Sequence, residues 1–155
     1  METENEKIDI IAAMVQKHPD LEAIKNEFYG LIQFGTSFAD LEGFLKRNGH
    51  IDKSLGTQTL HAGYDNLIEW VTDNALVLAI YFSLAKEGKI VITNAATDAT
   101  LLCYFIDGMG LNLPIAHKAK SYKTPHWFPI LFSRTDDAEK RHVPYAPINV
   151  SLIFR

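Results

Sequence analysis

The chain contains very little cysteine. Cys103 is the single cysteine among its 155 residues, so an intramolecular disulfide is excluded. Chains without disulfides are typical of reducing compartments, and we therefore expect a cytoplasmic protein. Apolar residues flank Cys103 within a predicted helix, which favours a small core residue over a reactive thiolate.

Long apolar runs are also missing. The longest largely apolar stretch, residues 75–84, is much shorter than the roughly 20 residues that a membrane-spanning helix needs. The first six residues are acidic and have no apolar region of the kind that a secretory signal contains. We therefore expect no association with a membrane.

The motifs that identify many cofactor and metal sites are absent from the sequence. It has no Walker-type phosphate loop, no dinucleotide-binding glycine pattern after a strand, no GxSxG and no HExxH. Its six histidines lack the close spacing of a zinc motif, and one cysteine cannot build a thiolate site. The sequence thus predicts no metal site and no cofactor.

What remains is an ordinary globular composition. Apolar residues make up 47% of the chain and charged residues 22%, values typical of a folded domain with a hydrophobic core. The length fits one domain, and no repeat, low-complexity tract or linker interrupts it. We predict a single domain over residues 1–155.

Apolar residues at helical spacing predict about five helices before residue 108. Their expected ranges are 8–17, 21–32, 38–48, 64–87 (one helix, or two joined near 73–74) and 97–107. The clearest start is Ser37, which Asp40 follows three residues later in a near-capping box. Residues 75–85 are apolar nearly all round, as in a central buried helix.

The pattern changes after Gly110, because five of the six prolines lie in 114–147 and β-branched and aromatic residues gather there. The expected strands are 89–93, 126–134 and 147–154, with 115–120 as a weaker candidate. A charged loop is expected over 135–146. This order predicts an α+β fold with about five N-terminal and central helices packed on one face of a small, mostly antiparallel C-terminal sheet.

Charge is distributed unevenly along the chain. Residues 1–107 hold 16 of the 19 acids and 8 of the 15 Lys and Arg, an excess of eight negative charges. Residues 108–155 hold three acids and seven Lys and Arg, and no acid lies between Asp107 and Asp136. A cationic, aromatic segment on an acidic body is a candidate site for an anionic ligand.

This cationic segment supports one enzymatic hypothesis. Two histidines and a lysine can cleave a phosphodiester without metal, and an aromatic ring can stack on a base. The candidates are His117 and His126 as acid and base, Lys118, Lys120, Lys123 and Arg134 as phosphate ligands, and Tyr122 and Trp127 as stacking residues. The alternative is a solvated loop with His126 and Trp127 partly in the core.

Three acids suggest a different surface. Asp65, Glu69 and Asp73 lie four residues apart, which would place them on one face of the expected 64–87 helix. Such a face can bind a basic protein partner. The alternative is a solvated outer face without a partner.

Because no catalytic motif is recognisable, the sequence favours a non-enzymatic interaction module that binds another protein. Small cytoplasmic immunity and accessory proteins offer an analogy at the level of fold. A small metal-independent ribonuclease or cyclic-nucleotide-processing enzyme is the alternative, with RNA or a nucleotide as its ligand. The sequence does not indicate whether the protein is a monomer or an oligomer.

Overall fold

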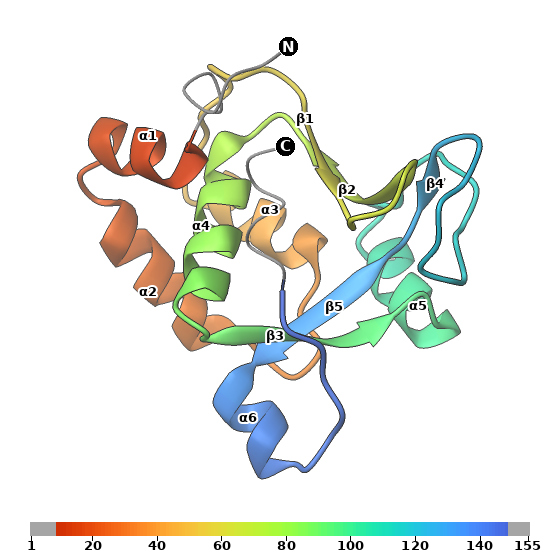
Figure 1. Ribbon diagram of the computed structural model, residues 1–155. Helices are drawn as coiled ribbons and strands as arrows, with labels where there is room; N and C mark the ends of the chain where they lie inside the picture. Colours follow the sequence, from red (N-terminus) through yellow and green to blue (C-terminus); the bar gives the residue numbers. More distant parts are fainter. Residues whose placement is uncertain (1–8, 149–155) are drawn as a thin grey trace.

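The computed structural model describes residues 9–148, and its fold is α+β, as the sequence predicts (Figure 1). The helices in this range are α1 (Ile10–Lys17), α2 (Leu21–Leu31), α3 (Phe38–Arg47), α4 (Ala75–Lys86), α5 (Asp98–Ile106) and α6 (Thr135–Lys140). The strands are β1 (Gln58–His61), β2 (Leu67–Thr72), β3 (Ile90–Ala95), β4 (His126–Trp127) and β5 (Ile130–Arg134). Helices α1–α4 gather on one side of β3 and β5, whereas α5 lies beside β4 (Figure 1).

Local signals set the starts of two N-terminal helices. Asp9 accepts a hydrogen bond from the Ala12 N–H at the start of α1 (3.1 Å). Before α3, Ser37 accepts from the Asp40 N–H (3.1 Å), and the Asp40 carboxylate accepts from the Ser37 N–H (2.8 Å). The capping box expected from the sequence is therefore complete.

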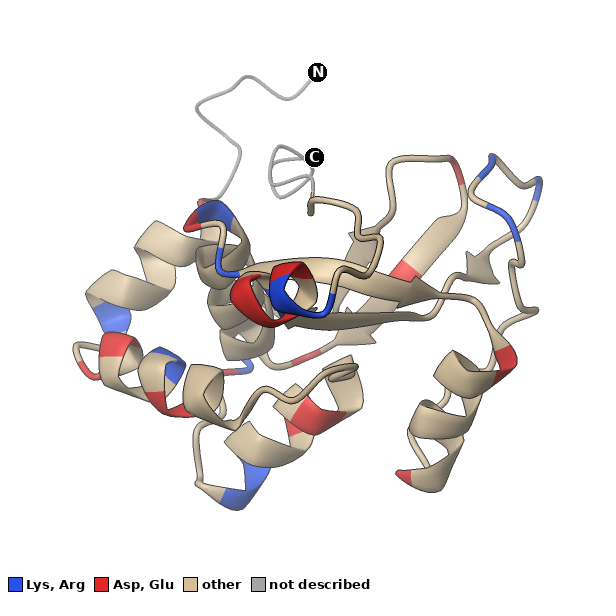
Figure 2. Cartoon of the chain, turned by 90° about the horizontal axis from the view of Figure 1, so that it is seen from below, with Lys and Arg blue, Asp and Glu red and all other residues tan. Residues whose placement is uncertain are grey.

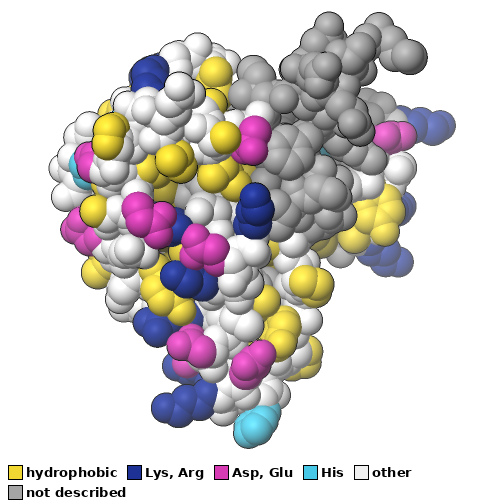
Figure 3. All heavy atoms as spheres, turned by 60° about the vertical axis from the view of Figure 1, so that its left-hand side comes forward, with side chains coloured by type: hydrophobic (Ala, Val, Ile, Leu, Met, Phe, Trp, Pro, Cys, Tyr) yellow, Lys and Arg dark blue, Asp and Glu magenta, His cyan; other side chains and the backbone are white. Residues whose placement is uncertain are grey.

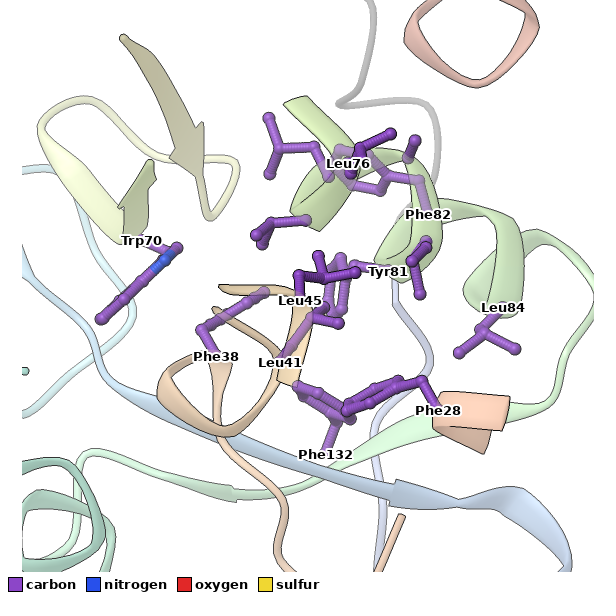
Figure 4. Packing of buried hydrophobic residues seen from close by; sticks show 14 of the residues in the cluster. Phe28, Phe38, Leu41, Leu45, Trp70, Leu76, Tyr81, Phe82, Leu84 and Phe132 are labelled. Carbon is purple, nitrogen blue, oxygen red and sulfur yellow. The ribbon is translucent and has the colours of Figure 1, made fainter. Parts of the chain in front are cut away.

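The apolar helix α4 is the centre of the core, as its sequence predicts. Nine of its twelve residues are buried. Tyr81 of α4 meets Phe38 of α3 and Phe132 of β5, with ring centroids 4.7 and 5.4 Å apart (Figure 4). Phe28 of α2 lies 6.5 Å from Phe132, so three helices and β5 share one aromatic cluster.

The prediction of helix over 64–87 is wrong for its first part. Residues 67–72 instead form β2, which pairs antiparallel with β1 across a turn where Asn66 adopts a φ of 58°. Helix α4 begins only after Asn74, whose side chain accepts a hydrogen bond from the Leu76 N–H (3.2 Å). Residues 67–70 are all buried, because both faces of β2 are covered. A strand buried on both faces has an apolar run that resembles a buried helix.

The strands form two small sheets, where the sequence predicted one at the C-terminus. The first has the order β1-β2-β4, with β2 and β4 parallel, and the second pairs β3 with β5 antiparallel. The expected 126–134 strand changes sheet at 128–129. The Phe128 N–H still donates to Ile68 (2.7 Å), whereas Pro129 has no N–H to continue the ladder, and its carbonyl accepts from Ala96 (2.7 Å).

Other parts of the second half differ from the expected loops and strands. Residues 135–140 form α6 within the expected 135–146 loop. Ile115 makes only an isolated bridge with Trp127, and the predicted 147–154 strand falls mostly outside the described residues. Within residues 9–148, no helix has the length and apolar character needed to cross a bilayer.

Candidate functional site

The cationic segment is a loop fastened to the β1–β2 turn. The Tyr122 N–H donates to the Asp65 carbonyl (3.0 Å), and the His126 N–H donates to the Asn66 carbonyl (2.8 Å). The Asn66 side-chain amide in turn donates to the Tyr122 carbonyl (2.9 Å). These bonds fix the backbone on both sides of Lys123. Figure 2 shows the loop's basic residues (blue) at the end of the molecule opposite α1 and α2.

The two histidines of the enzymatic hypothesis have different surroundings. His117 is exposed, whereas half-buried His126 stacks on Tyr122 with ring centroids 4.1 Å apart. The parallel bridge between Ile115 and Trp127 places His126 beside Pro114. His117 lies three residues beyond Pro114, outside this bridge.

The proposed phosphate ligands are divided between two places. Lys118, Lys120 and Lys123 are exposed on the loop, with the Lys120 ammonium 5.1 Å from the centre of the Tyr122 ring. Arg134 lies at the far end of β5, where its guanidinium donates to both carboxylate oxygens of Asp136 (3.3 and 3.2 Å). These hydrogen bonds raise the pKa of Arg134. The structure thus brings the three lysines together and leaves Arg134 apart.

Trp127 cannot stack on a base, which corrects one residue of the hypothesis. Its side chain is fully buried, and its ring N–H donates to the Glu69 carbonyl (3.1 Å). The Tyr104 ring packs against it edge-on, with centroids 5.0 Å apart. Of the two predicted stacking residues, only Tyr122 reaches the surface, and His126 already covers part of its ring.

The three acids expected on one helical face do not share a face. Asp65 is exposed in the β1–β2 turn, and Asp73 is exposed after β2, where it pairs with Lys53 (3.4 Å). Glu69 lies between them in β2 and is buried. The expected patch fails because Asp65 and Asp73 lie outside β2, whereas Glu69 within β2 is buried instead of facing solvent.

Two acids of the N-terminal region form ion pairs with lysines. Glu22 contacts buried Lys25 (2.8 Å), and Asp52 contacts Lys17 (2.9 Å). Hydrogen bonds from Ser54, His18 and Lys17 hold the pKa of Asp52 well below its usual range. Acidic and basic side chains accordingly alternate on the face shown in Figure 3, without a patch of one sign.

Glu69 and Tyr81 are the most unusual polar residues of the described chain. Glu69 is 8% exposed and Tyr81 is 1% exposed. Burial raises the pKa of Glu69 to about 8. Among buried side-chain polar atoms of residues 9–148, the Tyr81 hydroxyl alone has no hydrogen-bond partner.

Both residues line one cavity of about 110 Å³ between the two sheets and α4. Its other walls include Leu60 and His61 of β1, Phe82 of α4 and Ile92 of β3. Sequence reasoning missed this site because it assigned Glu69 to a solvated helix. The available signal was a single acid inside the run Leu67-Ile-Glu-Trp-Val71, which is otherwise apolar.

The outer face of α5 is the second feature that the sequence analysis missed. Leu102 and Phe105 are each 58% exposed, and Ile106 is 74% exposed. Their spacing places them on one side of the helix, which we call the α5 ridge. The opposite side is anchored by Tyr104, whose hydroxyl donates to the Ile130 carbonyl (2.8 Å). Cys103 is half-buried, in line with a packing role.

A groove of about 460 Å³ lies beyond the C-terminal end of α5. Its charged walls are Glu42, Asp73 and Asp107, with Lys46 and Lys53. Exposed Ile51 and half-buried Met109 supply apolar surface. The groove therefore adds apolar surface and charges of both signs next to the α5 ridge.

Neither a metal centre within residues 9–148 nor a related protein of known function helps to interpret the cavity and the α5 ridge. Within the described residues, no group of three or more His, Cys, Asp or Glu side chains is arranged to hold a metal ion. Comparison of the chain with protein-family models, with curated proteins and with solved structures finds no match in any of the three.

Proposed function

We propose that this protein is a non-enzymatic interaction module that binds a basic, amphipathic segment of another protein through the α5 ridge. The observation that carries the proposal is the exposure of three large apolar side chains on one face of one helix. Contiguous exposed apolar surface of this kind commonly marks an interaction site. Burying one such side chain contributes about 1.5–3 kcal/mol, so a few anchors suffice for specific binding.

Charge around the ridge selects the kind of partner. Asp98 stands at the first residue of α5 and Asp107 follows its last, and both are exposed. The sequence has no Lys or Arg between Lys89 and Lys118. In Figure 2, α5 accordingly carries red at both ends and no blue. A partner with apolar anchors flanked by Lys or Arg complements this surface.

Other surfaces support the proposal less well. In the N-terminal region, Glu22 is paired with Lys25 and Asp52 with Lys17, which leaves less free acidic surface there. The cationic loop supports the ribonuclease alternative less well, because Trp127 is buried and His126 stacks on Tyr122. The proposal includes a cytoplasmic location, since one cysteine suits a reducing compartment.

Site-directed crosslinking in the native cells tests this proposal. A photoreactive amino acid replaces Ala99, which is exposed and lies one turn before Leu102 on the ridge side. The chain is then compared with the same chain carrying Leu102→Arg or Leu31→Arg. Leu31 is the matched control, because its side chain is also 58% exposed but lies on α2.

The proposal requires one crosslinked protein that survives Leu31→Arg and is lost with Leu102→Arg. The purified pair should bind at least about tenfold more weakly after Leu102→Arg, and binding should weaken as salt is added. Equal crosslinking in both variants, or a crosslinked partner without a basic segment, would refute it.

A further inference from the structure

The cavity between β2 and α4 combines two buried polar groups with apolar walls. Glu69 enters from β2 and Tyr81 from α4, and the apolar part of the lining includes Leu60, Phe82 and Ile92. Among the buried side-chain polar atoms of residues 9–148, the Tyr81 hydroxyl is the one without a hydrogen-bond partner. Buried polar groups are normally paired, so the unpaired Tyr81 hydroxyl on a cavity that Glu69 also lines indicates a ligand that pairs with it.

The protonation of Glu69 decides which ligand chemistry fits. The titratable groups that face it are His61 from β1, Tyr81 from α4 and Tyr104 from α5, and none of the cavity's described walls is Lys or Arg. With a pKa of about 8, the Glu69 carboxyl group is mostly protonated at neutral pH. A protonated carboxylic acid and a phenol each donate one O–H. The cavity therefore offers two hydrogen-bond donors.

The size of the cavity limits the ligand. A dry cavity of about 150 Å³ lined by apolar side chains binds benzene. At about 110 Å³, this cavity suits a molecule, or an inserted chemical group, of about four or five non-hydrogen atoms. Its apolar walls favour a hydrocarbon body, and its donors favour one accepting oxygen.

We propose that this cavity binds a small, mainly apolar carbonyl compound whose oxygen accepts hydrogen bonds from Glu69 and Tyr81. This inference is independent of the α5 ridge. It makes the protein a receptor for a small ketone, aldehyde or ester in addition to a protein-binding module. A ligand with an ammonium group would need the opposite protonation state, because an ammonium ion pairs with Glu69 only after the carboxyl group has lost its proton.

Butanone and butylamine distinguish these two chemistries. Each is titrated into the full chain from pH 6 to 9, and binding is followed by NMR signals of the Tyr81 and Phe82 rings. We expect saturable butanone binding that is constant below about pH 7.5 and weakens toward tenfold per pH unit above pH 8. Butylamine binding that strengthens with pH would overturn the proposal in favour of a cation site.

Two variants connect the binding to the named groups. Glu69→Gln keeps a donor and the side-chain volume, so it should retain butanone binding and lose the dependence on pH. Tyr81→Phe removes a hydroxyl without a described partner, so the fold should persist while binding weakens about three- to tenfold. Wild-type affinity in Tyr81→Phe, or no saturable butanone binding to the wild-type chain at any pH, would refute the proposal.

Discussion

Helices α4 and α5 consist of the same kind of residue but have different surroundings. Both are apolar nearly all round, yet α4 is buried along almost its whole length, whereas only Thr100 and Tyr104 are buried in α5. Three other helices and two sheets surround α4, and α5 rests by one side on Trp70 and Trp127. An apolar helix therefore lies in the core only when other helices and strands pack against all of its sides. The uncovered side of α5 is the reason for proposing a protein partner.

The largest expected effect is a difference in stability between the two helices. Ile80 of α4 is fully buried, so Ile80→Ala should lower the free energy of unfolding by about 2–5 kcal/mol. Leu102→Ala on the α5 ridge should lower it by less than about 1 kcal/mol, because Leu102 is already 58% exposed. Urea denaturation measures both values. A loss of several kcal/mol in Leu102→Ala would mean that the ridge is covered in solution.

A second expected effect concerns the one acid buried against α4. Burial raises the pKa of Glu69 from its ordinary value of 4.5 to about 8, so the folded state holds a proton that the unfolded state releases. The free energy of unfolding therefore falls as pH rises from about 4.5 to 8, by about 2 kcal/mol between pH 5 and 7. Glu69→Gln should remove this fall.

Urea denaturation across this pH range tests the effect, with Glu27→Gln at an exposed position of α2 as the control. The control should follow the wild-type chain. Identical pH dependence in Glu69→Gln and the wild-type chain would show that Glu69 titrates normally and is open to solvent.

The smallest expected difference in stability concerns the residues that cap the starts of α4 and α5. Buried Asn74 accepts hydrogen bonds from the N–H groups of Asp52 (3.0 Å) and Leu76 (3.2 Å) and donates to the His50 carbonyl (3.0 Å). Exposed Thr97 caps α5 by accepting from the Thr100 N–H (3.2 Å). Asn74→Ala should cost about 2 kcal/mol and Thr97→Ala about 1 kcal/mol or less, as measured by thermal unfolding. Equal losses would show that Asn74 acts only as a helix cap.

Features that depend on neighbouring residues could be predicted from the sequence. The capping box at Ser37, the apolar α4 and the short strand at 90–95 all carry their signals within a few residues. The α+β class follows from the order of such segments. Strand β2 could not be predicted in this way, because β4, which covers its second edge, lies more than fifty residues away.

The candidate site was harder to predict than the fold. That Trp127 is buried depends on Tyr104 and on the Glu69 carbonyl, contacts made between distant segments. The Glu69 cavity exists only because β1, β2, β3 and α4 meet around it. By contrast, the three exposed loop lysines could be grouped from the sequence, since they lie within six residues of one another.

The position of β2 between β1 and β4 also has a consequence for synthesis on the ribosome. The β1–β2 hairpin can form early, but β4 follows Thr72 by 54 residues and emerges roughly 3 to 11 s later at usual translation rates. Meanwhile β2 has a free apolar edge that can pair with another nascent chain.

In water Glu69 is ionised and places a negative charge in the middle of that edge, which opposes such pairing. Once β4 arrives, Trp127 donates to the Glu69 carbonyl and the carboxyl group becomes buried and mostly neutral. We therefore expect the same acid to disfavour aggregation of the unfinished chain and to lose its charge when the fold is complete.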